Sequence, residues 1–161
     1  MVRQTRIDLA TFDDTLAIAQ NMREWDAREI YALRPEDPAQ LARDAVATTV
    51  SLNVFVNDAP VANMGGQQVA PGRWQVHMFA TPDFRRCSLF TTRYVVRQLI
   101  PTASLDGAWS AFCWSMAGHD EAHAWLKALG AKNVGEAALG RAGETFLLFE
   151  WPTNVFTQRK S

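Results

Sequence analysis

The sequence lacks any long hydrophobic run, and no uncharged apolar stretch reaches the ~18 residues that a bilayer-spanning helix needs. The first residues, Met1–Asp8, also lack the apolar core of a signal peptide. These two absences argue against a membrane protein and against a secreted one. We therefore expect a protein that is not secreted and has no membrane segment.

Cysteine is scarce and neither charge sign dominates. The two cysteines, Cys87 and Cys113, show no CxxC or Cys/His spacing, so we expect two buried thiols in a reducing compartment rather than a disulfide or metal site. Lys and Arg number 16 against 17 Asp and Glu, for a formal net charge of −1. This balance gives no global electrostatic attraction to nucleic acid, and we expect no nucleic-acid partner.

The chain has enough apolar residues to build one well-packed domain. It is 161 residues long and 48% hydrophobic, within the usual size and composition of a single globular domain. No internal repeat, low-complexity tract or linker divides it. We expect one domain over residues 1–151 and a C-terminal tail over residues 152–161, where the apolar periodicity ends.

Hydrophobic periodicity and turn residues predict an alternation of strands and helices. The expected strands are Thr5–Ala10, Val50–Val56, Val61–Val69, Trp74–Ala80, Ala108–Met116, Lys132–Leu139 and Glu144–Trp151, and the expected helices are Asp13–Met22, Arg23–Leu33, Pro38–Thr49, Ser88–Leu99 and Asp120–Leu129. Asn57–Pro60 and Pro101–Gly107 are expected as connections. Gly65 and Gly66 indicate a bulge or a close backbone approach.

The segment Trp74–Ile100 is the most informative stretch, with a strand, a short loop and a helix in succession. Its loop reads Pro-Asp-Phe-Arg-Arg-Cys-Ser-Leu-Phe and resembles the acetyl-CoA loop of the GNAT (GCN5-related N-acetyltransferase) superfamily. Arg85 falls on the arginine that opens that motif, whereas Ser88 and Phe90 replace its two glycines. A second match covers His119–Ala131, in which the superfamily's tyrosine position falls on Leu126.

The resemblance implies an α+β fold over about residues 3–151, with a mixed, mostly antiparallel central sheet of about seven strands flanked by helices. It places a degenerate acetyl-CoA site at Arg85, Arg86 and Ser88, and a possible catalytic base at His77. Leu126 has no proton to donate to a leaving thiolate. The resemblance therefore favours a catalytically degenerate protein without a cofactor. The alternative is a divergent N-acetyltransferase that uses acetyl-CoA.

Three short segments resemble more narrowly the GNAT-like proteins of short-tailed bacteriophages, of the internal virion protein A type. They are Asn21–Ile30, Phe84–Arg86 and Ala124–Ala131. This resemblance implies a structural or interaction role in the virion or its assembly. It also implies other phage structural proteins as partners, a possible homo-oligomer, and a location in the virion or the host cytoplasm.

Each polar candidate also has a structural interpretation. His77 is either the base or a hydrogen-bonded residue on the open face of the sheet. Asp83 and Glu29 either assist a base or bind a cationic substrate, or they are surface charges. His119 and His123 have the spacing of a metal-binding pair, but the sequence supplies no third ligand, so we expect no metal.

Cys87, next to Arg85 and Arg86, would have a lowered pKa if the thiol were exposed to their charges. The sequence also contains six tryptophans, most of which we expect in the core because of their large apolar area. Those left exposed would mark a protein–protein interface. The interface candidates are Trp25, Trp151 and the pair Arg85 and Arg86.

Overall fold

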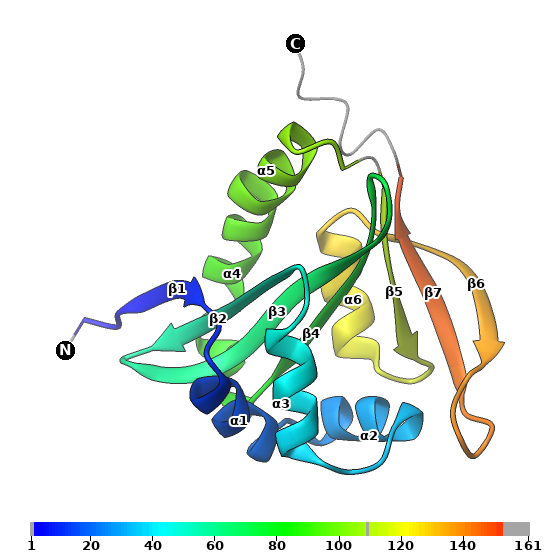
Figure 1. The fold of residues 1–161 in the computed structure, drawn as a ribbon, viewed down its shortest axis with the longest axis horizontal. Coiled ribbons are helices and arrows are strands. Elements are labelled where there is room, and N and C mark those ends of the chain that lie inside the picture. Colours follow the sequence, from blue (N-terminus) through cyan, green and yellow to red (C-terminus); the bar gives the residue numbers. More distant parts are fainter. Residues whose placement is uncertain (1, 109, 153–161) are drawn as a thin grey trace.

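The computed structural model describes residues 2–108 and 110–152 as an α+β fold built on one seven-stranded sheet (Figure 1). The strands are β1 (Thr5–Leu9), β2 (Val50–Val56), β3 (Ala59–Ala70), β4 (Arg73–Ala80), β5 (Ser110–Met116), β6 (Lys132–Ala138) and β7 (Thr145–Trp151). The helices are α1 (Phe12–Gln20), α2 (Glu24–Leu33), α3 (Pro38–Val46), α4 (Ser88–Tyr94), α5 (Ile100–Leu105) and α6 (Asp120–Ala128). The predicted fold class and the order of the elements are confirmed.

The sheet has the order β1-β2-β3-β4-β5-β7-β6, and all its strand pairs are antiparallel except β4–β5. The parallel β4–β5 pair is short, because only Arg73–Gln75 pairs with Ser110–Phe112. Beyond those residues the two strands diverge toward their C-terminal ends (Figure 1). The sheet is therefore continuous at one end and split at the other.

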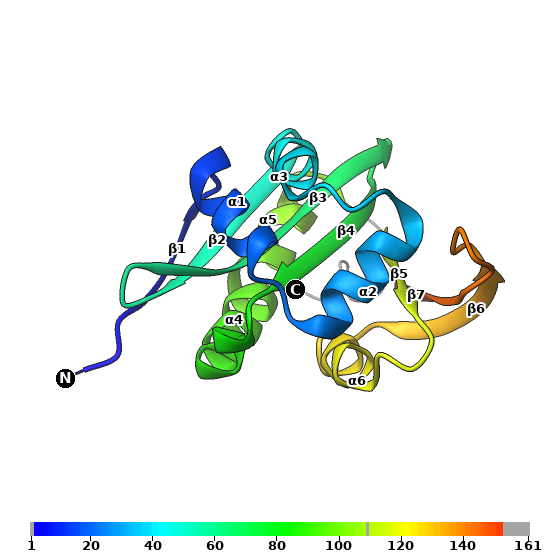
Figure 2. The same ribbon diagram turned by 90° about the horizontal axis from the view of Figure 1, so that it is seen from below.

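Helices cover both faces of this split sheet. α1 and α3 pack on one face around Ile18, Leu41 and Phe79. α4 and α6 lie on the opposite face, as the view in Figure 2 shows, and Ile100 and Ala103 of α5 pack against the same cluster as Leu126 of α6. Buried residues from β2 to β5, such as Val54 and Ala111, pack there against Leu126 in the largest hydrophobic cluster. The split between β4 and β5 thus lies in the middle of a two-sided core.

Local sequence signals account for several helix and turn boundaries. Thr11 caps α1 by accepting a hydrogen bond from the Asp14 N–H, and Asp37 caps α3 in the same way. Asn57 and Asp58 both have positive φ, which suits the two-residue turn of the β2–β3 hairpin. The predicted four-residue connection was too long, because Ala59 and Pro60 already belong to β3.

Gly65 is explained by a close backbone approach and not by a bulge. A Cβ at this position would lie 2.1 Å from the Val50 carbonyl oxygen and 3.0 Å from Cε1 of His77. The register irregularities of β3 occur elsewhere, near Pro60 and near Gln68. Only glycine therefore fits beside the His77 ring.

The helix that follows the loop is longer than predicted, and the expected connection at Pro101–Gly107 is wrong. A π-helical stretch, Val95–Leu99, joins α4 to α5, and the helix continues through Pro101 to Leu105. Proline has no N–H and normally clashes with the preceding turn of an α-helix. The wider π-turn just before Pro101 provides the room that an α-turn would not.

Two predictions lie partly outside the described residues. The C-terminal tail was predicted over residues 152–161, of which only Pro152 is described. Trp109, predicted at the start of the fifth strand, is also outside them. Among the helices of the described chain, none is long and apolar enough to cross a membrane.

Candidate functional site

A cavity of about 840 Å³ occupies the gap between the diverging ends of β4 and β5. β4 lines it with Trp74, Val76 and Met78, and β5 with Ala111 and Cys113. The cavity passes through the sheet, because residues of α2 and α3 line one end and residues of α4, α5 and α6 line the other. Most of the lining is apolar, which suits an uncharged part of a ligand.

His77 on β4 borders this cavity and is held by a buried polar cluster. Its Nε2 lies 2.7 Å from Oδ1 of Asn63. The Asn63 amide nitrogen donates to Ser51 and Asn53, so its oxygen is the acceptor for His77. Nε2 of His77 therefore carries the hydrogen, and Nδ1 keeps its lone pair. His77 is hydrogen-bonded on the sheet face and also borders the cavity.

Burial lowers the pKa of His77 to about 4. The ring is consequently neutral at pH 7, which leaves Nδ1 able to accept a hydrogen bond. A base with so low a pKa does not deprotonate a free ammonium ion. It is suited instead to accept a proton from a nitrogen that has become acidic during bond formation.

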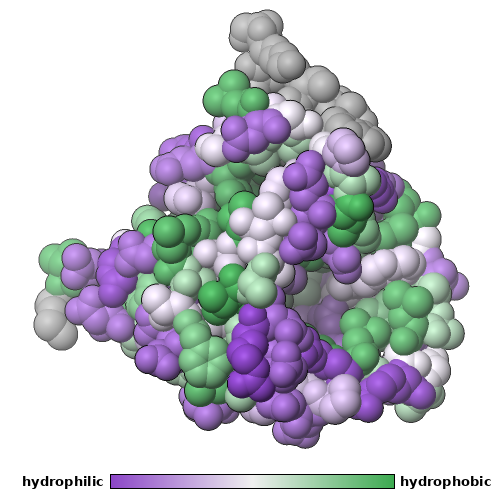
Figure 3. Space-filling model, in the orientation of Figure 1, coloured by the Kyte–Doolittle hydropathy of each residue, from purple (hydrophilic) through white to green (hydrophobic). Residues whose placement is uncertain are grey.

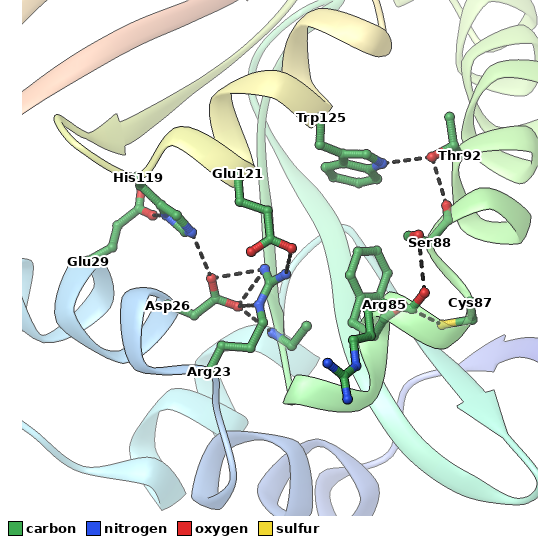
Figure 4. Close-up of polar contacts among 12 residues, drawn as sticks. Arg23, Asp26, Glu29, Arg85, Cys87, Ser88, Thr92, His119, Glu121 and Trp125 are labelled. Carbon is green, nitrogen blue, oxygen red and sulfur yellow. Dashed lines mark hydrogen bonds and ion pairs between the residues drawn. The ribbon is translucent and has the colours of Figure 1, made fainter.

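Two carboxylates of α2, Asp26 and Glu29 (Figure 4), accept hydrogen bonds from the strand ends on either side of the split. Asp26 accepts a hydrogen bond from the Ala80 N–H at the end of β4, at 2.8 Å. Glu29 accepts one from the Met116 N–H at the end of β5, at 2.9 Å. These side chains replace ladder hydrogen bonds that the diverging strands cannot make with each other. We call this pair, together with Arg23 and His119, the α2 clamp.

His119 links the two carboxylates of the α2 clamp. Its Nδ1 lies 2.6 Å from Glu29 and its Nε2 lies 3.4 Å from Asp26. The ring stacks on Trp25, with centroids 5.5 Å apart. Glu29 is therefore a structural group and not a freely solvated charge, which corrects one of its two predicted roles.

Arg23 supplies the counter-charge for Asp26 through two 3.0 Å hydrogen bonds. Burial raises the pKa of Asp26, while the nearby Arg23 guanidinium acts in the opposite direction. Asp26 was not singled out from the sequence. The only available signal was its spacing of three residues from Arg23 on one helix, a pattern that is common on exposed surfaces.

His123 points away from the α2 clamp toward β5. Its Nε2 lies 3.2 Å from the Ser115 hydroxyl, and burial lowers its pKa. The rings of His119 and His123 are 6.4 Å apart and tilted. In the described part of the chain no group of three His, Cys, Asp or Glu side chains could hold a metal ion. Each histidine instead has a hydrogen-bonding partner of its own.

The loop predicted to hold acetyl-CoA forms a 3-10 turn, Pro82–Arg86, before α4. Arg85 and Arg86 are exposed, and Arg86 lies 3.9 Å from Asp83, which is a surface charge. The Ser88 hydroxyl points back to the Arg85 carbonyl oxygen at 3.5 Å (Figure 4). Both arginine side chains are thus available to an anion.

Cys87 does not have the predicted reactivity. The thiol is buried, and burial raises its pKa despite the arginines nearby. Burial also raises the pKa of Cys113 to about 12. The prediction of two buried thiols is confirmed, because both cysteines are free and buried. Neither thiol is poised to act as a nucleophile near neutral pH.

Phe90 and Leu126 occupy two of the positions at which the sequence departs from the superfamily pattern. Phe90 is 40% exposed and does not border the cavity, so its ring does not block the gap between β4 and β5. Leu126 borders the cavity from α6 and offers no proton. Beside it, the Trp125 indole N–H donates to Thr92 and joins α6 to α4 (Figure 4).

The tryptophans proposed as interface anchors are largely used inside the molecule. Trp151 is only 6% exposed, and its indole N–H donates to the Leu129 carbonyl oxygen, so it belongs to the core. Trp25 is half-buried between His119 and the guanidinium of Arg28. Of the predicted interface residues, Arg85 and Arg86 are therefore the exposed ones.

Comparison with solved structures shows that the fold is that of GNAT-family acetyltransferases. The ribosomal-protein-S18-alanine N-acetyltransferase of Escherichia coli has a TM-score of 0.70 and 16% identity, over 93% of this chain and 94% of that one. AAC(6')-Ib in complex with ribostamycin and coenzyme A has a TM-score of 0.69 and 11% identity, over 98% of both chains. A phosphinothricin acetyltransferase from Sinorhizobium meliloti in complex with acetyl-CoA has a TM-score of 0.66 and 13% identity, over 92% and 88%.

Sequence comparison gives no such match. No family model matches the chain, and no curated protein matches it. At 10–16% identity the structural matches establish the fold alone.

Proposed function

We propose that this chain binds an acyl-CoA thioester in the β4–β5 cavity and transfers the acyl group to a primary amine. The observation that carries this proposal is the open gap itself. A side chain of Phe90, Trp109 or Trp114 filling the gap would have argued against a ligand there, and of these Trp109 lies outside the described residues. Phe90 lies outside the cavity, and Trp114 borders it without closing it, since about 840 Å³ remains. Two structures with this fold are complexes with coenzyme A or acetyl-CoA.

The residues at hand suit a mechanism in which positioning contributes most of the rate. The amine nitrogen attacks the thioester carbonyl carbon from the α2–α3 side, where His77 lies. Nδ1 of His77 accepts the proton from the positively charged nitrogen of the adduct, which is far more acidic than a free ammonium ion. The C–S bond then breaks, and because Leu126 has no proton, the thiolate is protonated by water.

The phosphates would lie at the loop that precedes α4. Arg85 and Arg86 are exposed there and present planar guanidinium groups that pair well with phosphate oxygens. The Ser88 hydroxyl, which donates to the Arg85 carbonyl oxygen at 3.5 Å, would have to turn from that oxygen to donate to a phosphate. Without the two glycines, binding would depend on these side chains more than on backbone N–H groups.

The test is calorimetric titration of the purified chain with CoA and acetyl-CoA at moderate salt. We expect micromolar dissociation constants and a loss of at least tenfold in the double variant Arg85→Ala, Arg86→Ala, because two charge-assisted contacts are removed. Arg93→Ala is the matched control, since this exposed arginine lies on α4 beyond the loop. Absence of binding at millimolar CoA would end the proposal.

A second candidate function is a non-catalytic role in a phage particle or its assembly, with other phage structural proteins as partners. Its support is that Ser88, Phe90 and Leu126 replace the residues that the superfamily's chemistry uses. Leu89, at 62% exposed, and Phe90 also present apolar surface beside Arg85 and Arg86, as many interfaces do. Quantitative mass spectrometry of purified particles would find the chain at a fixed copy number, and its absence from them would contradict this role.

A further inference from the structure

Several apolar side chains line the α2–α3 end of the cavity. Ile30 and Leu33 of α2 and Leu41 and Ala45 of α3 border it, together with Leu139 beyond β6. Figure 3 shows this face of the molecule hollowed beside α3, with hydrophobic side chains along one side of the hollow. We call this end of the cavity the apolar chamber.

The carboxylates that border the apolar chamber are already paired. Asp26 binds Arg23 and the Ala80 N–H, and Glu29 binds the Met116 N–H and His119. A third, Asp44, pairs with Arg34 at 2.5 Å and also accepts from Gln40.

None of these carboxylates is left over to hold the positive charge of an amine substrate. The Thr48 hydroxyl at the same end donates within its own turn, to the Ala45 carbonyl oxygen. Burying a charged group here without a partner would be costly. The chamber therefore suits an uncharged, apolar occupant.

The chamber is continuous with the gap in which the thioester would lie. One cavity runs from Tyr94 and Leu126 on one side of the sheet, past Val76 and Cys113, to Leu33 at the other side. A chain attached to the carbonyl carbon in the gap would extend into the chamber without leaving the cavity. At its far mouth Leu33 and Leu139 are 44% and 42% exposed, so apolar surface continues to the exit.

We propose that the apolar chamber receives the acyl chain of a medium-chain acyl thioester, so that acetyl-CoA is not the preferred donor. This inference rests on the proposed function. The transfer itself is unchanged: the amine nitrogen bonds to the carbonyl carbon, the C–S bond breaks, His77 takes the proton from the nitrogen, and water protonates the departing thiolate. The hydroxide that remains takes the proton from His77, so the net reaction moves one proton from nitrogen to sulfur. The chain length alters only how much apolar surface the bound donor buries.

The experiment is a calorimetric series of CoA, acetyl-CoA, butyryl-CoA, hexanoyl-CoA and octanoyl-CoA, each below its micelle concentration. A fully buried methylene is worth about fourfold in affinity, so each pair of methylenes should tighten binding about fifteenfold until the chamber is filled. Octanoyl-CoA is the diagnostic member, because only its chain reaches well past the gap.

A variant at the mouth of the apolar chamber tests whether the acyl chain lies in that chamber. Leu33→Asp puts a charge at a position that is already 44% exposed, so the fold should tolerate it. We expect it to weaken octanoyl-CoA at least tenfold and to leave acetyl-CoA within twofold. Leu9→Asp is the matched control, because Leu9 is 79% exposed on β1 and does not border the cavity. It should change neither affinity.

The possible failures are distinguishable. If CoA binds and affinity does not depend on chain length, the acyl-chain assignment is overturned while the proposed function stands. If no member of the series binds, the proposed function fails as well. A parallel titration with octylamine in the presence of CoA tests whether the chamber binds the amine acceptor instead of the acyl chain. A gain for octylamine together with a flat acyl series would assign the chamber to the amine and overturn the inference.

Discussion

Replacing His77 by glutamine should remove a specific loss of stability at mildly acidic pH. The pKa of His77 is lowered from 6.5 to about 4 in the folded protein because the ring is buried. Between these two values the unfolded chain binds more protons than the folded one, so stability falls as pH decreases from 6.5 to 4. The full difference of 2.5 pKa units corresponds to about 3 kcal/mol, of which about 2 kcal/mol is lost at pH 5.

Glutamine is the informative substitute because its amide can still donate to Oδ1 of Asn63 and does not titrate. The assay is urea denaturation of both proteins at pH 7.5, 6, 5 and 4.5, with the difference in free energy of unfolding plotted against pH. All other titrating groups are common to both proteins and cancel in that difference. The wild type should lose about 2 kcal/mol relative to His77→Gln between pH 7.5 and 5. A difference that stays constant with pH would refute the buried, neutral state of His77.

Three further outcomes follow from the contacts described. Asp26→Ala should lower the free energy of unfolding by about 3–5 kcal/mol in chemical denaturation, because it removes the acceptor of the Ala80 N–H and leaves the half-buried Arg23 with only Glu121, 3.8 Å away; a loss under 1 kcal/mol would contradict the clamp. Gly65→Ala should lower the free energy of unfolding by several kcal/mol in the same assay, since its Cβ would lie 2.1 Å from the Val50 carbonyl oxygen. Gly135→Ala is the control and should leave the free energy of unfolding nearly unchanged, because a Cβ there has no atom within 4 Å. Cys87 and Cys113 should react with a thiol reagent at pH 8 only after unfolding, because both are buried and both thiol pKa values are raised; rapid labelling of the native protein would disprove this.

The sequence predicted the features that depend on neighbours along the chain. The turn that begins at Asn57 and the helix that begins at Asp120 arise from local propensities, and the structure has them. Pro101 misled the prediction because its cost to a helix depends on the turn before it, and a π-turn leaves no clear signature in the residue types.

The candidate site was less predictable because its key contacts join distant parts of the chain. Glu29 reaches the Met116 N–H across 87 positions, and Asp26 reaches Ala80 across 54. Whether a carboxylate is solvated or accepts a hydrogen bond from a strand end depends on where two strands separate. No local sequence pattern encodes the position of that separation. The same holds for Phe90, whose ring would block or spare the gap according to the direction of the helix that carries it.

The most direct test of the account is a crystal structure of the chain grown with CoA. We predict that the pantetheine arm lies between β4 and β5, alongside Val76 and Met78, with the phosphates near Arg85 and Arg86. CoA bound at any other surface, or an empty gap at saturating ligand, would contradict the account.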